Sequence, residues 1–166
     1  MQKLIKDGKL TNDRWILVKE ASNEGILSAL PFKSIMVPLR FWKLYQSELE
    51  EYTGEVTIWL DSNERLADIP GNINQFPLIA LNFPIFSDGR SYTNARELRE
   101  SYGYEGEIRA IGDVLRDQIY YMHRCGFNAF SLRFDQDTEA CLSAFNDFTT
   151  GYQASIDQHQ PLFRRR

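Results

Sequence analysis

The feature that most constrains the fold of this chain is an alternation of short apolar segments with segments of helical periodicity. Four apolar runs have the length of a strand: residues 56–60, 78–81, 108–111 and 129–132. Helical patterns follow three of them: residues 93–102, 114–125 and from 138 into the 140s. Alternating strands and helices form βαβ units, whose crossovers are nearly always right-handed and pair the strands in parallel. We therefore predict an α/β fold with a mainly parallel sheet of about four or five strands, built from repeated βα units.

The amino-terminal third of the chain predicts a small β element followed by one helix. Asp7–Gly8 lies between two apolar runs near the amino terminus, which is the composition of a turn between strands. Residues 21–34 have the composition of a connecting stretch, and an apolar stripe predicts a helix from Pro38 that stops at Gly54. Because domains contain about 100–200 residues, we expect residues 1–166 to form a single domain.

Composition excludes several classes of function. The net charge is −4, with 19 Lys and Arg against 23 Asp and Glu, whereas proteins that bind nucleic acid normally carry excess basic charge. The two cysteines and two histidines lack the spacing of a metal or cluster site. No apolar run approaches the ~18 residues of a membrane span, and the amino terminus lacks a secretory signal. We therefore expect a cytoplasmic protein with no metal and with neither nucleic acid nor membrane as a partner.

Polar residues follow the predicted strands at the edge where ligands of parallel sheets bind. Asp61, Asn82, Asp113 and Arg133 come directly after successive strands, and the loop FPIFSDGRSY at residues 83–92 leads into a helix. We expect these residues to share one rim of the sheet. The candidate ligand-binding residues of this rim are Asp61, Asn82, Asp88, Arg90, Tyr92 and Arg133.

Arg90 is the leading candidate for binding a small anion. It lies just ahead of a predicted helix, whose free N–H groups and dipole favour negative charge, and a guanidinium adds bidentate contacts. Arg96 and Arg109 are expected to assist Arg90, with Asp88 orienting it. A salt bridge from Arg90 to Asp88 or Glu97 is the competing interpretation, in which these charges serve only stability.

Two aspartates are the candidates for acid–base catalysis. Asp113 and Asp117 lie four residues apart around the start of the predicted helix 114–125. Aspartates there also complement the helix dipole, and Asp113, like Asp61, could serve as an N-cap. No cofactor is recognised, because the chain has no Gly-x-Gly-x-x-Gly after a strand and no phosphate-binding Gly-Lys-Ser/Thr loop.

Four segments carry a resemblance to a known family: FPIFSDGRSY at 83–92, ARELR at 95–99, GEIRAIGDVLRDQ at 106–118 and RCGF at 124–127. They are similar to the signature of an uncharacterised bacterial family catalogued as an oxidoreductase, or an accessory protein, of assimilatory sulfite reduction. The close match covers about residues 78–132, and members of the family are typically encoded beside sulfite reductase. The resemblance implies a role in that reduction with the reductase as a partner, and it implies no particular catalytic residues.

Three functions are compatible with these observations. The first is a non-redox accessory protein of sulfite reduction that binds a small anion, another small ligand or the reductase; the absence of a cofactor motif favours it, because sulfite reduction draws electrons from a redox cofactor. The second is an oxidoreductase with an unrecognised cofactor site, which an absorption spectrum would reveal. The third is a homodimeric scaffold that uses the aromatic residues around 41–42 and 145–148.

Overall fold

The computed structural model describes residues 3–20 and 25–165, in which the strands form one curled, eight-stranded sheet. The strands are β1 (Lys3–Lys6), β2 (Lys9–Asn12), β3 (Trp15–Leu17), β4 (Ser34–Pro38), β5 (Glu55–Leu60), β6 (Leu78–Phe83), β7 (Glu107–Gly112) and β8 (Ala129–Phe130). Their spatial order is β2-β1-β8-β7-β6-β5-β4-β3.

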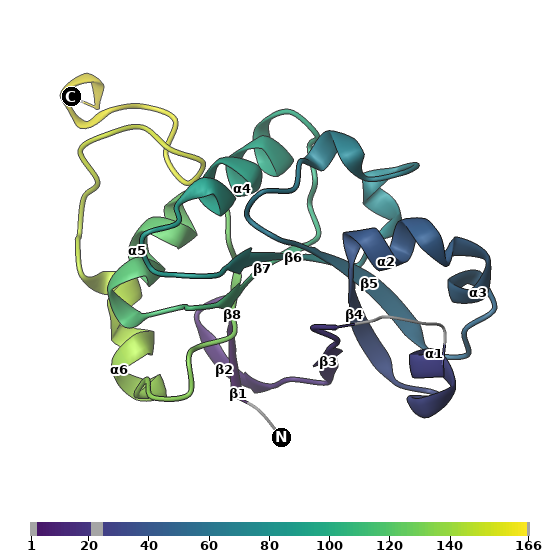
Figure 1. Cartoon of the computed structure of the whole chain (residues 1–166). Helices are drawn as coiled ribbons and strands as arrows, with labels where there is room; N and C mark the ends of the chain where they lie inside the picture. The colour runs from purple at the N-terminus through teal and green to yellow at the C-terminus, as the bar shows by residue number, and fades with distance from the viewer. Residues whose placement is uncertain (1–2, 21–24, 166) are drawn as a thin grey trace.

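The six strands from β3 to β8 are parallel, and each pairs with the strand that follows it in the chain. Because crossovers of one hand carry successive connections to the same side of a sheet, the helices gather on its outer side (Figure 1). β1 and β2 form an antiparallel hairpin, and β1 pairs with β8. Asp7 and Gly8 form its turn with φ angles of 50° and 71°, which suits a two-residue hairpin loop of type I′.

The two edge strands of the sheet, β2 and β3, are consecutive in the chain. Only Asp13 and Arg14 separate them. The sheet therefore curls back toward its own beginning, and Figure 1 shows the strands arranged as a ring around the middle of the molecule. Among the described residues, no ladder of hydrogen bonds joins β2 to β3.

The described residues also form six helices and four short 3-10 segments. The helices are α1 (Gly25–Ala29), α2 (Leu39–Leu44), α3 (Gln46–Glu50), α4 (Arg90–Glu100), α5 (Arg116–Arg124) and α6 (Thr138–Ser143). The 3-10 segments are η1 (Leu66–Asp68), η2 (Ile73–Gln75), η3 (Ala144–Asn146) and η4 (Leu162–Arg164).

Alternate residues of the strands belong to two different cores. The larger core lies under the helices and packs Ile79 and Ile108 with residues such as Leu98 of α4 and Met122 of α5. The smaller core lies on the other face and is formed by Met36, Leu78, Ala80 and Ile111 with the partly buried Trp15, Leu17 and Trp59. Burial on both faces explains why the strands read as continuous apolar runs rather than as alternating ones.

The predicted α/β class and mainly parallel sheet are confirmed, but the sheet has more strands than the four or five expected. β4 is the strand that the prediction missed. Its last residue, Pro38, is also the N-cap of α2, so the apolar strand and the apolar helix run together without a turn to separate them. β3, which the prediction placed in a loose amino-terminal element, pairs with β4. Residues 21–24 of the expected connecting stretch lie outside the described residues.

The expected helix from Pro38 to Gly54 is two short helices, because α2 and α3 meet at Tyr45, which has φ −122° and ψ 36°. Phe41 and Trp42 of α2 are buried in the outer core. Phe145 packs against the same core, while Phe148 is exposed. The aromatic residues of the scaffold hypothesis thus serve mainly the interior of this chain.

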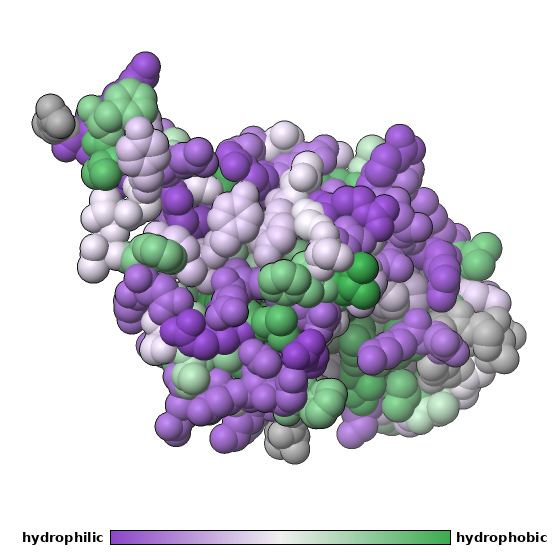
Figure 2. All heavy atoms as spheres, turned by 60° about the vertical axis from the view of Figure 1, so that its left-hand side comes forward, coloured by the Kyte–Doolittle hydropathy of each residue, from purple (hydrophilic) through white to green (hydrophobic). Residues whose placement is uncertain are grey.

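The carboxyl-terminal residues 151–165 project from the body and contact it at Arg124 of α5. Figure 1 shows this segment leaving the molecule beyond α6, and Figure 2 shows apolar side chains at its projecting end. The exposed apolar residues of this segment are Tyr152, Leu162 and Phe163. Its one isolated bridge joins Ser155 and Gln158.

Candidate functional site

The carboxyl ends of β5 and β6 bring Asp61 and Asn82 together. The Asn82 side-chain amide donates a hydrogen bond of 3.0 Å to Asp61 Oδ1, and the backbone N–H of Ser62 donates to the same oxygen at 2.8 Å. Glu64 closes the turn, since its Oε2 accepts from the backbone N–H of Asp61 at 2.7 Å. The Asp61 carboxylate is therefore oriented by the turn after β5 and not by a helix that it caps.

Gly112 at the end of β7 makes room for the Asn82 side chain. Its φ of +91° lies in the left-handed region, and a Cβ at this position would overlap Asn82 Oδ1 and the Phe83 carbonyl oxygen. Only glycine combines this backbone conformation with so close an approach. The next residue, Asp113, donates its backbone N–H to that Phe83 carbonyl at 2.7 Å, so β6 and β7 end in a fixed register at the rim.

Arg90 is the first residue of α4, and the Asp88 carboxylate occupies the place where an anion would bind. Arg90 donates to Asp88 from its backbone N–H at 3.2 Å, from Nε at 3.0 Å and from Nη2 at 2.6 Å. The Ser62 hydroxyl donates to the same carboxylate at 2.6 Å. These bonds, those of Arg90 first, hold the pKa of the Asp88 carboxyl well below its usual range. The competing interpretation of Arg90, a salt bridge to Asp88, describes the observed geometry.

A second arginine, Arg133, joins two carboxylates after β8. Its Nη1 donates to Asp113 Oδ1 at 2.7 Å, while Nε and Nη2 form a bidentate pair with Asp135 at 2.7 Å each. The guanidinium lowers the pKa of Asp135 to about 2, and both carboxylates raise the pKa of Arg133. Asp113 precedes α5 without capping it, because Leu115 is the N-cap residue.

The rim as a whole carries more negative than positive charge. Arg90 and Arg133 face five carboxylates: those of Asp61, Glu64, Asp88, Asp113 and Asp135. Three exposed apolar side chains belong to the loops of the same edge: Ile85 and Phe86 after β6, 58% and 55% exposed, and Phe134 after β8, 98% exposed. The rim thus combines acidic groups with solvent-exposed hydrocarbon.

Three of the predicted residues are engaged away from the charged groups of the rim. Tyr92 of α4 packs its ring against Phe83 and Tyr121, each at 5.0 Å between centroids, and burial raises its pKa to about 12. Arg96 pairs with Glu100, one turn later on α4, at 3.3 Å. Asp117 has an 85% exposed side chain that lies 3.8 Å from Arg116. Because Asp113 lies outside α5, the two aspartates do not share a helical face.

The expectation that Arg109 assists Arg90 is wrong, because Arg109 is paired elsewhere in the fold. Its side chain is only 2% exposed, and it donates to Asp13 at 2.8 and 2.9 Å and to Glu107 at 2.7 Å. These partners lie before β3 and at the amino end of β7, whereas Arg90 follows the carboxyl end of β6. Arg109 lies within β7, whereas the rim residues follow the carboxyl ends of the strands, so Arg109 is not part of the rim.

The prediction did not include Ser62, Asp13 or Glu107. A signal for the last two was present, because Arg109 interrupts an apolar strand and a buried arginine requires a buried partner. Glu107 lies two residues earlier and therefore points to the same face of the strand. Asp13 is 96 residues away in the chain, and no local pattern marks it.

The described residues contain no group of three His, Cys, Asp or Glu side chains placed to hold a metal ion. Cys125 and Cys141 are buried free thiols, and burial raises the pKa of both. None of the helices in the described residues has the length and apolarity needed to cross a bilayer.

Comparison with known proteins assigns the chain to a family. No curated protein matches the chain. The model of a family described as "Bacterial protein of unknown function (DUF934)" matches residues 57–163, which include most of β5, all of β6 to β8 and all of the rim. Because this match spans well over half of the 166 residues, the chain belongs to this bacterial family, DUF934.

Proposed function

We propose that this chain is an accessory protein of bacterial sulfite reduction that acts by binding the reductase through the rim after β5 to β8. The link to sulfite reduction comes from the resemblance of residues 78–132 to a family encoded beside sulfite reductase. The choice of a protein partner over a free anion comes from the charges and exposed side chains of the rim.

The observation that carries the proposal is the neutralisation of both rim arginines from within the chain. The Asp88 carboxylate takes the backbone N–H and the guanidinium of Arg90, so a free sulfite or sulfate ion would have to displace a carboxylate that is already held. The surplus of carboxylates also repels a free anion. These features support a partner with its own basic groups.

The exposed apolar side chains support the same partner. Ile85, Phe86 and Phe134 present hydrocarbon beside the charged groups. Aromatic side chains and arginines are enriched at the centres of protein interfaces, where they carry much of the binding energy. A small anion makes no use of such side chains, whereas a protein surface does.

The test is the affinity of the purified chain for sulfite reductase from the same bacterium, measured by biolayer interferometry. We expect Phe86→Ser and Phe134→Ser to weaken binding at least about tenfold, as is usual for apolar anchors. Phe32→Ser is the matched control, because Phe32 is 78% exposed and lies ahead of the amino end of β4, away from the rim. Absence of reductase binding by the wild type, or equal loss in all three variants, contradicts the proposal.

A calorimetric titration with sulfite, sulfate and phosphate separates the two kinds of ligand. We expect no saturable binding of any of these ions by the wild type. If an ion binds, and Arg90→Ala abolishes that binding without changing the melting temperature, the rim is an anion site and the docking proposal is wrong.

A further inference from the structure

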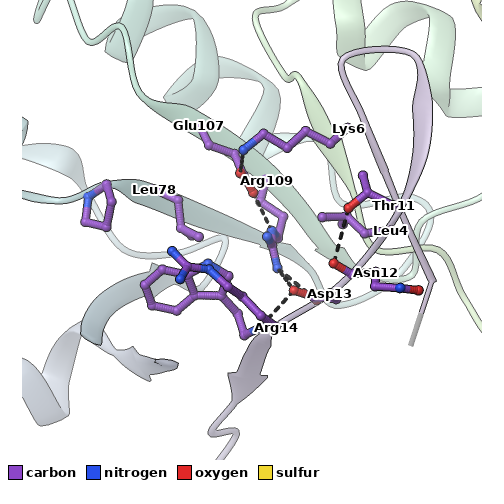
Figure 3. Close-up of a pocket in the computed structure, with 11 residues that line it drawn as sticks. Leu4, Lys6, Thr11, Asn12, Asp13, Arg14, Leu78, Glu107 and Arg109 are labelled. Carbon is purple, nitrogen blue, oxygen red and sulfur yellow. Dashed lines mark hydrogen bonds and ion pairs between the residues drawn. The ribbon is translucent and has the colours of Figure 1, made fainter. Parts of the chain in front are cut away.

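A cavity of about 260 Å³ lies on the concave face of the sheet, apart from the rim. It is open to solvent and is bordered by the β1–β2 hairpin on one side and by β3 and the first residues of β6 and β7 on the other (Figure 3). The lining residues that matter for binding are Lys6, Asp13, Trp15, Leu78, Glu107 and Arg109. The volume is close to the lower end of small-molecule sites, which begin at about 300 Å³.

A buried ion network forms one wall of this cavity. Arg109 bridges the carboxylates of Asp13 and Glu107, and Lys6 Nζ lies 2.7 Å from Glu107 Oε2. The side chains of the arginine and both carboxylates are at least nine-tenths buried. Figure 3 shows these four side chains in a row from Lys6 to Asp13.

The network leaves hydrogen-bond donors facing the cavity. Arg109 uses Nε and Nη1 for its carboxylate partners, and its Nη2 makes no hydrogen bond to any residue that the structure describes. Arg109 is one of the residues that line the cavity, so the unused N–H groups of Nη2 are the donors that it can offer to a ligand there. Lys6 Nζ has three donors and one carboxylate partner.

The charges of the lining leave one positive charge uncompensated by the residues of the cavity itself. Lys6, Arg14 and Arg109 are cationic, whereas Asp13 and Glu107 are anionic. Arg14 also reaches Glu55 outside the lining, at 2.9 Å. With this pair included, the charges around the cavity balance. What the cavity offers a ligand is therefore the unused N–H groups of Arg109 and Lys6, which suit an oxygen acceptor such as a carboxylate.

The wall formed by β3 and the start of β6 is hydrocarbon and one indole ring. Pro77 and Leu78 line it together with Trp15, while Leu4 lies on the hairpin side. The Arg14 guanidinium lies 5.5 Å from the centroid of the Trp15 ring. An inorganic oxyanion has nothing to contact on this wall. An organic group attached to the charged one does.

We propose that this cavity is a binding site for a small organic monocarboxylate, a class of ligand that the proposed docking function does not involve. The carboxylate accepts hydrogen bonds from Arg109 Nη2 and Lys6 Nζ, and the organic group packs against Trp15 and Leu78. Asp13 and Glu107 hold Arg109 in position from the other side of its guanidinium.

The first test compares benzoate with benzamide, which have similar shapes but differ in charge. Saturation-transfer NMR and the fluorescence change of the full-length protein follow each titration. We expect saturable binding of benzoate and at least about tenfold weaker binding of benzamide, because hydrogen bonds to an ionised acceptor are about twice as strong as neutral ones. Failure of benzoate to saturate, or equal affinities for the two compounds, overturns the proposal.

The second test uses two lysines of one hairpin. Lys6→Met removes a donor from the cavity, whereas Lys9→Met removes the same charge from the paired position of β2, which does not line the cavity. We expect Lys6→Met to abolish the preference for benzoate and Lys9→Met to retain it. An equal effect of both variants means that general charge attraction carries the binding, and the site is then refuted. Reductase affinity of the two variants, measured alongside, stays unchanged, so this proposal and the docking proposal fail separately.

Discussion

At the scale of single residues, the same kind of ion pair has two different roles in this chain. Arg109 is enclosed with Asp13 and Glu107, whereas Arg90 holds Asp88 with a side chain that is 62% exposed. Removing one member of a buried pair leaves an uncompensated charge in a medium of low dielectric constant, but an exposed pair is screened by water. The contribution of the Arg90–Asp88 pair to stability is therefore best measured as a change of the melting temperature with pH.

Asp88→Asn tests the ionisation of the rim carboxylate. The folded state holds the pKa of Asp88 below the ordinary value of 3.8, chiefly through Arg90. Its stabilising contribution is therefore complete above pH 3.8 and is lost as the pH falls through the lowered pKa. We expect the melting temperatures of wild type and variant, followed by circular dichroism, to differ at neutral pH and to converge in acid. The exposed Asp117→Asn is the control, and a difference that grows as the pH falls contradicts the assignment.

At the scale of elements, helix α5 holds the projecting carboxyl-terminal segment through one residue. The Arg124 carbonyl accepts from the backbone N–H of Ile156 at 3.2 Å and from the Ser155 hydroxyl at 2.6 Å. Its guanidinium donates to Asp157 at 3.2 Å and to the Gln153 carbonyl. Arg124 is itself buried, so the segment is fastened to the end of α5 although most of its length is exposed.

Arg124→Ala is expected to release this segment while the sheet remains folded. A hydrogen bond to a charged group contributes about 1.5–3 kcal/mol, and a loss of that size raises the detached population roughly tenfold or more. Limited chymotrypsin digestion, followed by mass spectrometry, then cleaves at Tyr152 correspondingly faster. Arg96→Ala removes an arginine from the surface of α4 and should leave the cleavage rate unchanged. Unaltered cleavage in Arg124→Ala means that other contacts hold the segment.

At the scale of the whole molecule, the curled sheet is closed by a side-chain contact in place of a strand ladder. β2 and β3 are its edges, and Asp13 lies in the two-residue link between them. Arg109 reaches across the concave face from β7 to this carboxylate. The ion pair therefore ties the start of the chain to the middle of the sheet.

Asp13→Ala is expected to lower the free energy of unfolding by about 3–5 kcal/mol, because Arg109 and Glu107 remain buried without the second carboxylate. Urea denaturation, followed by fluorescence of Trp15 and the other two tryptophans, measures this loss. Asp68→Ala removes an aspartate from the exposed pair with Arg65 and should leave the denaturation midpoint unchanged. A similar midpoint for Asp13→Ala and wild type excludes a closing role for the pair.

The sequence by itself determined the α/β class, the parallel pairing and the meeting of Asp61 with Asn82 at one edge. These follow from apolar runs separated by helices, since parallel strands place their carboxyl ends together. The salt bridge between Arg90 and Asp88, which are two residues apart, was one of the two interpretations of Arg90 that the sequence offered. Tertiary structure alone decided β4, the curl of the sheet, and the pairing of Arg109 with Asp13. The physical reason is that sequence periodicity is a local property, which shows only which face of a strand is buried. The contact between Arg109 and Asp13, 96 positions apart, depends instead on how far the complete sheet curls.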